Sequence, residues 1–169
     1  PGSIQLGIDF AAERTRSTGL SQSFDTLTNT GGAFSTPGTL SLNANGSNLA
    51  VFDLNSSDVL GNLRLDNLAA NATVLINVHG QSIDFGAHSY ENFAAGRVLF
   101  NLPQATQITF AGGVNASFLA PLASFNGIGG ARGSVGLHRI GGVGCKFFVF
   151  CTASINRSIH YTMHHRCNV

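Results

Sequence analysis

Residues 97–121, RVLFNLPQATQITFAGGVNASFLAP, contain three short apolar runs, each followed by turn-forming residues. The runs cover residues 98–102, 108–110 and 117–120, and each ends at or near a proline or a glycine pair. Short runs rich in β-branched and aromatic residues, punctuated by Gly and Pro, predict β-strands and not helices. The first and third runs are apolar almost throughout, which is typical of strands covered on both faces in parallel sheets. Charge is nearly absent here, so we expect a scaffold and no catalytic site.

The strongest apolar runs recur at a nearly regular interval along the chain. They centre on Phe52, Ile76, Phe100 and Leu119; the first two intervals are equal and the last is somewhat shorter. One coil of a three-sided solenoid, with three short strands and three corners, takes about 20–24 residues, which is close to this spacing. The sequence therefore predicts an all-β class, mainly β with one flanking α-helix, built as a parallel β-helix or solenoid of such coils. An antiparallel sandwich is the competing architecture, because it also spaces short strands evenly.

The helix is expected at residues 10–27, ahead of the strands. Asp9 can cap its first turn, and Leu20, Phe24 and Leu27 stand at i, i+4 and i+7 on one face. At 169 residues the chain is expected to form one domain over 1–169, with β-coils at about 39–136 and a divergent, Cys-containing segment at 137–169. Within the coils we expect strands at 39–43, 49–54, 63–65, 73–78, 83–85, 98–102, 107–110 and 116–120.

Composition excludes several classes of partner. The net charge is +1 and charged residues make up 10% of the chain, against about 25% in ordinary soluble domains. This gives no electrostatic case for nucleic acid. No run reaches the 18 or so apolar residues of a membrane helix, so no membrane insertion is expected. A surface dominated by Asn, Ser and Thr suits a neutral extracellular protein, or one that packs against copies of itself.

Three cysteines lie near the C-terminus, at Cys145, Cys151 and Cys167. If residues 146–150 form one strand, its flanking cysteines lie roughly 20 Å apart, too far for a disulfide. Cys167 is therefore the expected partner of Cys151 or Cys145, and one thiol is left over.

Five Asn-x-Ser/Thr sequons are candidate N-glycosylation sites, provided that the chain is secreted by a eukaryote. An unmodified asparagine in a turn is an equally good interpretation of each. The five asparagines are Asn45, Asn55, Asn71, Asn115 and Asn156.

Catalytic and metal-binding patterns are weak. His160 and His164 share a face of an alternating segment, with His165 and Cys167 near, but solvated tail histidines are the default interpretation. His79, Asp84 and His88 could join a serine in a hydrolytic triad, yet no Gly-x-Ser-x-Gly elbow is present. The Asp84-Phe85-Gly86 triplet lacks every other kinase motif, and the glycines of residues 127–133 lack dinucleotide-binding spacing. We expect no enzyme, no metal and no cofactor.

An ordered set of short motifs over residues 38–134 resembles the choice-of-anchor A domain, an adhesive domain of surface proteins. The Leu20-Ser21 pair stands in the segment that looks like that domain's helix. The strand motifs, in the family's order, are GTLSL at 38–42, LAVFDL at 49–54, ATVLINVHG at 72–80, VLFNLPQAT at 98–106 and FLAP at 118–121.

The layout is also similar to ice-binding-protein-like β-solenoids, in which a helix lies beside a stack of β-coils. The resemblance implies an extracellular adhesive or surface-layer role and no known catalytic residues. Fewer residues precede the helix than is usual in the family, and residues 145–169 fit poorly. These departures indicate a processed, trimmed or divergent form.

We therefore expect a secreted or cell-surface structural and adhesive module, a disulfide-containing glycoprotein. Its expected partners are its own copies, other surface or matrix proteins, or a glycan. An end stripped of its first coils would expose strand edges, and a neighbouring copy could cover them through residues 4–10 to build a filament.

The alternative is a carbohydrate- or ice-binding module that uses a flat solenoid face. Ice binding is disfavoured because Thr26, Thr28 and Thr30 lie before the coils, where they do not recur at the coil period. Trp is absent, Tyr90 and Tyr161 are the only tyrosines, and the thirteen Phe are expected in the core, so aromatic sugar platforms are scarce.

Overall fold

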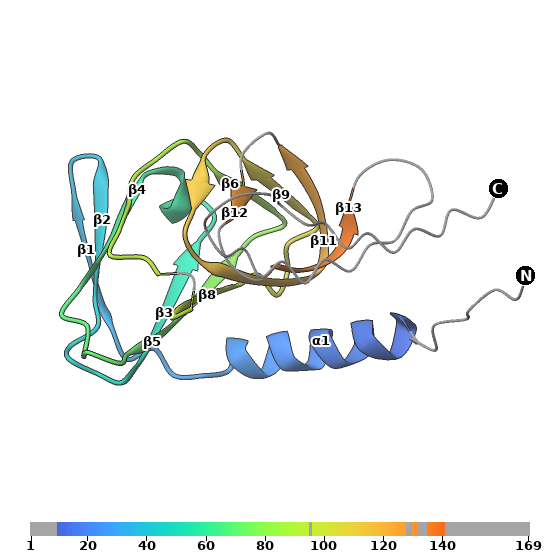
Figure 1. Ribbon diagram of the computed structural model, residues 1–169, viewed down its shortest axis with the longest axis horizontal. Coiled ribbons are helices and arrows are strands. Elements are labelled where there is room, and N and C mark those ends of the chain that lie inside the picture. The colour runs from blue at the N-terminus through green and yellow to red at the C-terminus, as the bar shows by residue number, and fades with distance from the viewer. Residues whose placement is uncertain (1–9, 95, 128–129, 132–134, 141–169) are drawn as a thin grey trace, which may run out of the picture.

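The computed structural model describes residues 10–94, 96–127, 130–131 and 135–140. It is mainly β with one α-helix, and its strands curl around an apolar interior (Figure 1). The elements in chain order are α1 (Phe10–Asp25), β1 (Gly32–Thr36), β2 (Thr39–Asn43), β3 (Leu49–Asn55), the short 3₁₀ helix η1 (Asp58–Leu60), β4 (Asn62–Asp66), β5 (Thr73–His79), β6 (Ser82–Phe85), β7 (Tyr90–Glu91), β8 (Val98–Asn101), β9 (Gln107–Phe110), β10 (Gly113–Val114), β11 (Ser117–Gly127), β12 (Gly130–Ala131) and β13 (Val135–Ile140).

These strands form three sheets. The largest has the order β3-β5-β8-β11-β9-β6, with β13 paired to β11, and every pair in it is parallel. The second has the order β1-β2-β4-β7 and is mixed, because β1 runs antiparallel to β2. The third is the short parallel pair β10-β12. Strand β11 pairs with β8 through its first residues and with β9 through its last, so this one strand connects two parts of the curled sheet.

The offset between paired residues can be compared with the spacing of the apolar runs in the sequence. Leu49 pairs with Thr73 and Val74 pairs with Val98, and the two pairs have the same offset along the chain. Phe100 pairs with Phe118 at a clearly shorter offset. The prediction of a mainly β fold with one flanking helix is confirmed, and the antiparallel sandwich is wrong, because every described strand pair except β1–β2 is parallel. The structure shows a curled parallel sheet together with a mixed sheet, and it does not show regular coils.

Aromatic rings fill the interior where strands pair in register. Phe85 lies opposite Phe110 in the β6–β9 pair, and their rings stack at 5.1 Å with an interplanar angle of 13°. Phe100 and Phe118 stack at 5.2 Å and 12° across the β8–β11 pair. Parallel in-register pairing places equivalent positions above one another, so these contacts follow directly from the register. The prediction that the Phe residues form the core is confirmed for these four and wrong for Phe34, whose side chain is 61% exposed.

Helix α1 lies along the outer face of the large sheet, against β5, β8 and β11 (Figure 1). Its predicted bounds agree with the structure at the first residue and run two residues too far at the end. Its predicted apolar face is wrong. Leu20 is 41% exposed and Leu27 lies beyond the helix, whereas Ser21 is completely buried. The helix is therefore anchored by a serine that sequence periodicity passed over.

The N-terminal edges of the sheets are covered by the chain itself. The backbone amides of Thr30 and Gly31 both donate to the carbonyl of Val51 in β3, at 3.0 and 3.2 Å. The Val51 amide donates in return to the Thr30 hydroxyl at 3.0 Å. Strand β1 covers the edge of β2 in the same way. Among the described residues, the expected bare edge is thus absent from β2 and is covered in part on β3, whereas β1 is the end strand of its own sheet.

Candidate functional site

A polar ladder on the outer face of the large sheet, buried at Asn77 and Asn101 and exposed at Asp53, holds the helix in place. Asp53, Asn77 and Asn101 lie opposite one another in β3, β5 and β8. Asn77 Nδ2 donates to Asp53 Oδ1 at 3.0 Å, and Asn101 Nδ2 donates to Asn77 Oδ1 at 2.9 Å. The second amide hydrogens reach α1, where Asn77 Nδ2 donates to the Phe24 carbonyl at 3.1 Å and Asn101 Nδ2 to the Ser21 carbonyl at 2.9 Å. The Ser21 hydroxyl donates to Asn101 Oδ1 at 2.6 Å. Both hydrogens of each amide are used, so the ladder is a docking device for α1.

His79 lies at the end of this ladder. Its Nε2 is 3.7 Å from Asp25 Oδ1, at the last residue of α1, and 3.9 Å from Asp53 Oδ1. The other two residues weighed for a hydrolytic triad lie elsewhere, since Asp84 is exposed on β6 and His88 is exposed beside Gly86. The carboxylates that the structure brings near His79 are therefore Asp25, at the C-terminal end of the helix, and Asp53 on the sheet.

The remaining predicted sites fall into two groups. Among the described residues, no three His, Cys, Asp or Glu side chains are placed to hold a metal ion. His160, His164, His165 and all three cysteines lie outside the described part of the chain, so the metal and disulfide predictions stay predictions.

The sequon asparagines differ in how their amide groups are used. Asn45 Nδ2 donates to the Thr30 carbonyl at 3.2 Å, and Asn115 Nδ2 donates to the Phe93 carbonyl at 2.9 Å. Asn55 and Asn71 are exposed. Asn156 lies outside the described residues. Glycan attachment replaces a hydrogen on Nδ2, so the first two sites are already engaged in the fold and the exposed pair are the better candidates.

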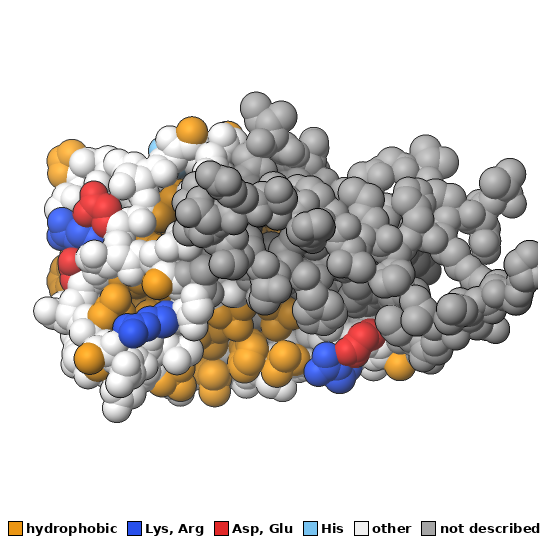
Figure 2. Space-filling model, viewed as in Figure 1, with side chains coloured by type: hydrophobic (Ala, Val, Ile, Leu, Met, Phe, Trp, Pro, Cys, Tyr) orange, Lys and Arg blue, Asp and Glu red, His pale blue; other side chains and the backbone are white. Residues whose placement is uncertain are grey.

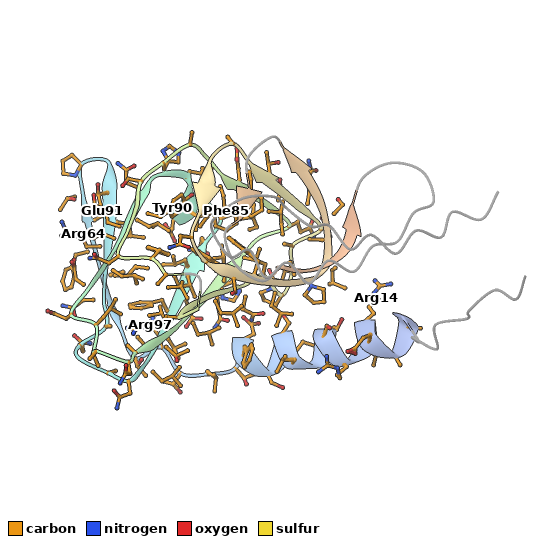
Figure 3. All side chains as sticks on the ribbon, in the orientation of Figure 1. Arg14, Arg64, Phe85, Tyr90, Glu91 and Arg97 are labelled. Atoms are coloured by element: carbon orange, nitrogen blue, oxygen red, sulfur yellow. The ribbon has the colours of Figure 1, made fainter. Side chains whose placement is uncertain are left out.

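The outer face of the sheet β1-β2-β4-β7 carries a row of side chains that we call the Phe34 strip. Phe34 on β1 pairs with Ser41 on β2, Ser41 with Arg64 on β4, and Arg64 with Glu91 on β7. On β4 the neighbouring leucines are buried, and on β2 Leu42 is buried and Leu40 is partly buried. Because side chains alternate between the two faces of a sheet, the strip occupies the other face, although Ser41 is itself buried there. In Figure 3, Arg64 and Glu91 lie beside β1 and β2, at the end of the molecule away from β13.

Two contacts define the geometry of the strip. The Phe34 ring lies over Gly32, where an added Cβ would be 3.3 Å from Phe34 Cε2. Arg64 Nε donates to Asp66 Oδ2 at 3.0 Å, with the arginine side chain 45% exposed. Figure 2 shows that charged side chains on this view of the described residues are few and stand in small separate groups. The strip therefore combines an exposed ring with one cation and the carboxylate of Glu91, and the carboxylate of Asp66 lies beside it as the partner of Arg64.

Tyr90 lies next to Glu91 but points inward, where its ring packs edge-on against Phe93 at 5.7 Å. Burial raises the pKa of Tyr90 to about 12, and the negative charge of Asp84 acts in the same direction. The phenol hydroxyl is buried and has no hydrogen-bond partner among the described residues. Tyr90 is thus a core residue with a polar end, and it does not supply an exposed aromatic surface.

Sequence reasoning missed both Phe34 and the helix-docking ladder. A signal for the ladder existed, because Asp53, Asn77 and Asn101 are spaced 24 residues apart, the same interval as the first apolar runs. The signal for Phe34 was its place between Gly31-Gly32 and Pro37-Gly38, which together bracket a short hairpin.

These features define a class of protein: a β-rich module with an apolar interior, a helix fastened to one outer face, and polar groups on its outward faces. The chain belongs to the family described as "Putative Ice-binding-like adhesive domain", whose model matches residues 2–137. This confirms the adhesive, ice-binding-like resemblance, while the narrower choice-of-anchor A name stays a prediction. No curated protein and no solved structure matches the chain. In the described part of the chain, no helix has the length and apolar character needed to cross a membrane.

Proposed function

We propose that this chain is an adhesive module of an extracellular or cell-surface assembly, and that it acts by presenting surface and not by catalysis. The observation that carries the proposal is the match of the adhesive family over residues 2–137. Adhesion places the module outside the cell, where it would meet surface and matrix partners.

The distribution of side chains supports this proposal. The inward positions of the curled sheet are filled with apolar residues, including Phe52, Phe85 and Phe100, which are almost fully buried. The described acidic and basic side chains lie on outward faces or beneath the helix, and Tyr90 alone among the ionisable groups discussed above points inward. Catalysis needs a cleft in which acid, base and nucleophile converge, whereas adhesion needs a stable scaffold with polar and aromatic side chains on its exposed faces.

We interpret the stacked parallel strands as turns of a β-solenoid of unequal length. The pairs Thr39–Asn62 and Leu49–Thr73 have nearly equal offsets along the chain, whereas the later pair Gly113–Gly130 has a shorter one. The pair Leu63–Tyr90 has a longer offset, so these values support turns of unequal length that are shortest among the last described strands. Such a stack exposes long faces for its size, which suits an adhesive role.

Self-association into a filament is part of the proposal. Strand β1 is the terminal strand of its sheet, and one of its edges has no partner strand among the described residues. Edge strands pair readily with a strand from another chain. Electron microscopy of concentrated protein is expected to show linear assemblies, and a strictly monomeric population at high concentration would remove this part of the proposal.

Ice binding gains no support from the register. An ice-binding face needs threonines stacked over several neighbouring strands, but in the parallel pairs Thr39 lies opposite Asn62, Thr73 opposite Leu49 and Thr109 opposite Asp84. Among the described strand pairs, threonine meets threonine at Thr36 and Thr39, beside the turn of the antiparallel β1–β2 hairpin. We therefore expect no thermal hysteresis, and clear hysteresis activity would revive that alternative.

The adhesive proposal is tested by coating beads with the folded chain and measuring their retention on cells and extracellular matrix under flow. Albumin-coated beads are the matched control. Retention well above albumin is expected, together with no turnover of generic ester and glycoside substrates. Retention equal to albumin, or metal-dependent hydrolysis, would contradict the proposal.

A further inference from the structure

We propose that the Phe34 strip is a glycan-binding site, with Phe34 as the stacking platform and Arg64, Asp66 and Glu91 as hydrogen-bonding groups. This inference rests on the proposed adhesive function and names the chemical class of its partner, a neutral sugar chain.

The first argument is the exposure of Phe34. At 61%, it is the most exposed of the large hydrophobic side chains in the described part of the chain. Its ring rests over Gly32, a position where a Cβ would crowd the ring. The glycine thus lets the ring lie along the strand, with area left open to solvent. Exposed aromatic area held in one orientation loses little entropy on binding, and it suits the apolar C–H face of a sugar ring.

The second argument is the register. Phe34, Ser41, Arg64 and Glu91 lie in one row that crosses four neighbouring strands. Neighbouring strands are about 4.8 Å apart, so Arg64 lies about 10 Å from Phe34 and Glu91 about 14 Å from it. A row of this length accommodates a short oligosaccharide lying across the strands, with one ring on Phe34 and the next beside the charged groups.

The third argument is the mixture of donors and acceptors. Sugar hydroxyls both donate and accept, and the strip offers guanidinium donors beside carboxylate acceptors. Arg64 uses Nε for Asp66, and its other guanidinium nitrogens extend the donor set. One cation beside two carboxylates does not favour an anionic polymer, so the charge selects a neutral glycan over nucleic acid or an acidic polysaccharide.

Ser41 provides an independent sign of an incomplete site. It lies between Phe34 and Arg64 in the row, its side chain is 6% exposed, and its hydroxyl has no hydrogen-bond partner among the described residues. A buried hydroxyl without a partner is unfavourable, and native proteins rarely leave one. Because this oxygen has almost no accessible surface in the free protein, a ligand hydroxyl would satisfy it once a neighbouring side chain moved aside.

The test is retention of the purified chain on insoluble cellulose, chitin and mannan, with alginate as an acidic comparison. We expect retention on at least one neutral polysaccharide and weaker retention on alginate. Phe34→Ala is expected to weaken binding by about tenfold or more, and Glu91→Gln by a smaller factor. The matched control is Leu60→Ala, which removes a similarly exposed apolar side chain from η1, outside the strip.

Several results would overturn the proposal. These are no retention on any neutral polysaccharide, equal losses for Phe34→Ala and Leu60→Ala, or retention on protein-coated surfaces alone, which would make the strip a protein-docking site. Bead retention under flow distinguishes failure of the glycan site from failure of the proposed adhesive function. Wild-type adhesion that survives Phe34→Ala unchanged refutes the glycan site alone, whereas wild-type beads that behave like albumin refute the adhesive function itself.

Discussion

Asn101 donates an amide hydrogen bond to the side-chain oxygen of Asn77, which stands 24 residues earlier in the chain, and both side chains are completely buried. The same spacing separates Asn77 from Asp53. A polar side chain in this position on the outer face would be costly if it lacked partners. Helix α1 supplies those partners, so the ladder and the helix depend on each other.

Ser21→Ala is expected to loosen the helix. The substitution removes the 2.6 Å hydrogen bond to Asn101 Oδ1 and leaves that buried oxygen without its donor, at a cost of about 1–3 kcal/mol in the free energy of unfolding. Urea denaturation measures the loss, and hydrogen exchange of the α1 amides should rise with it. Ser23→Ala is the matched control in the same helix, because the Ser23 hydroxyl is exposed and donates only to the Gly19 carbonyl. Equal effects of the two variants would show that the ladder does not hold the helix.

Phe100→Ala and Phe34→Ala should differ sharply in stability. Phe100 is fully buried, with ring contacts to Phe85, Phe93 and Phe118, so its loss leaves a cavity and is expected to cost about 3–5 kcal/mol. Phe34 projects from an end strand, and its truncation should change the free energy of unfolding by no more than about 0.5 kcal/mol. Chemical denaturation of the two variants side by side makes this comparison. A large loss for Phe34→Ala would mean that the ring supports the fold and is not held ready for a ligand.

Alkaline pH should destabilise the fold through Tyr90. Its pKa is raised to about 12 in the folded protein, whereas an unfolded tyrosine titrates near 10. The folded state therefore keeps this proton more tightly, and the resulting stability is present below pH 10 and lost as the pH rises from about 10 to about 12. Unfolding curves across this range, with ultraviolet difference absorbance for tyrosinate, measure the effect.

Tyr90→Phe is the control for this titration. It should remove most of the loss between pH 10 and 12, and it should be neutral or slightly stabilising at pH 7, because the hydroxyl that it deletes is buried without a partner among the described residues. An unchanged alkaline transition in this variant would assign the loss to other groups.

Two glycine substitutions should have opposite effects. Gly19 lies inside α1 with open space around its Cα, so Gly19→Ala is expected to stabilise the protein by about 0.5–1 kcal/mol. Gly80 has a φ of 143° between β5 and β6, where an added Cβ would lie 2.9 Å from the Ser56 Cβ. Gly80→Ala should therefore destabilise by about 1–3 kcal/mol. Thermal unfolding of both variants measures these effects. A Gly80→Ala variant as stable as the wild type would contradict the backbone conformation described at Gly80.

The sequence predicted much of the fold because its strands are short, apolar and well bounded. The expected strands at 39–43 and 107–110 have the bounds of β2 and β9, and the helix begins at Phe10 as expected. Strand β1 was missed, since the glycines and the proline around it signal turns more strongly than its five residues signal a strand.

The candidate sites were harder to predict, because their properties arise from the position of each residue in the fold. Ser21 is buried only because α1 meets Asn101, which is 80 residues away in the chain. Phe34 is exposed only because β1 is the end strand of its sheet. The sequence carries the 24-residue spacing of the ladder and the turn residues around β1, but neither signal says that Ser21 is buried or that Phe34 is exposed.

The most direct test of the central claim, that this chain works by presenting surface, is the retention under flow of beads coated with the intact, folded chain. The account predicts retention on cells or matrix well above that of albumin-coated beads, with no accompanying substrate turnover. Retention no better than albumin across these surfaces would contradict it.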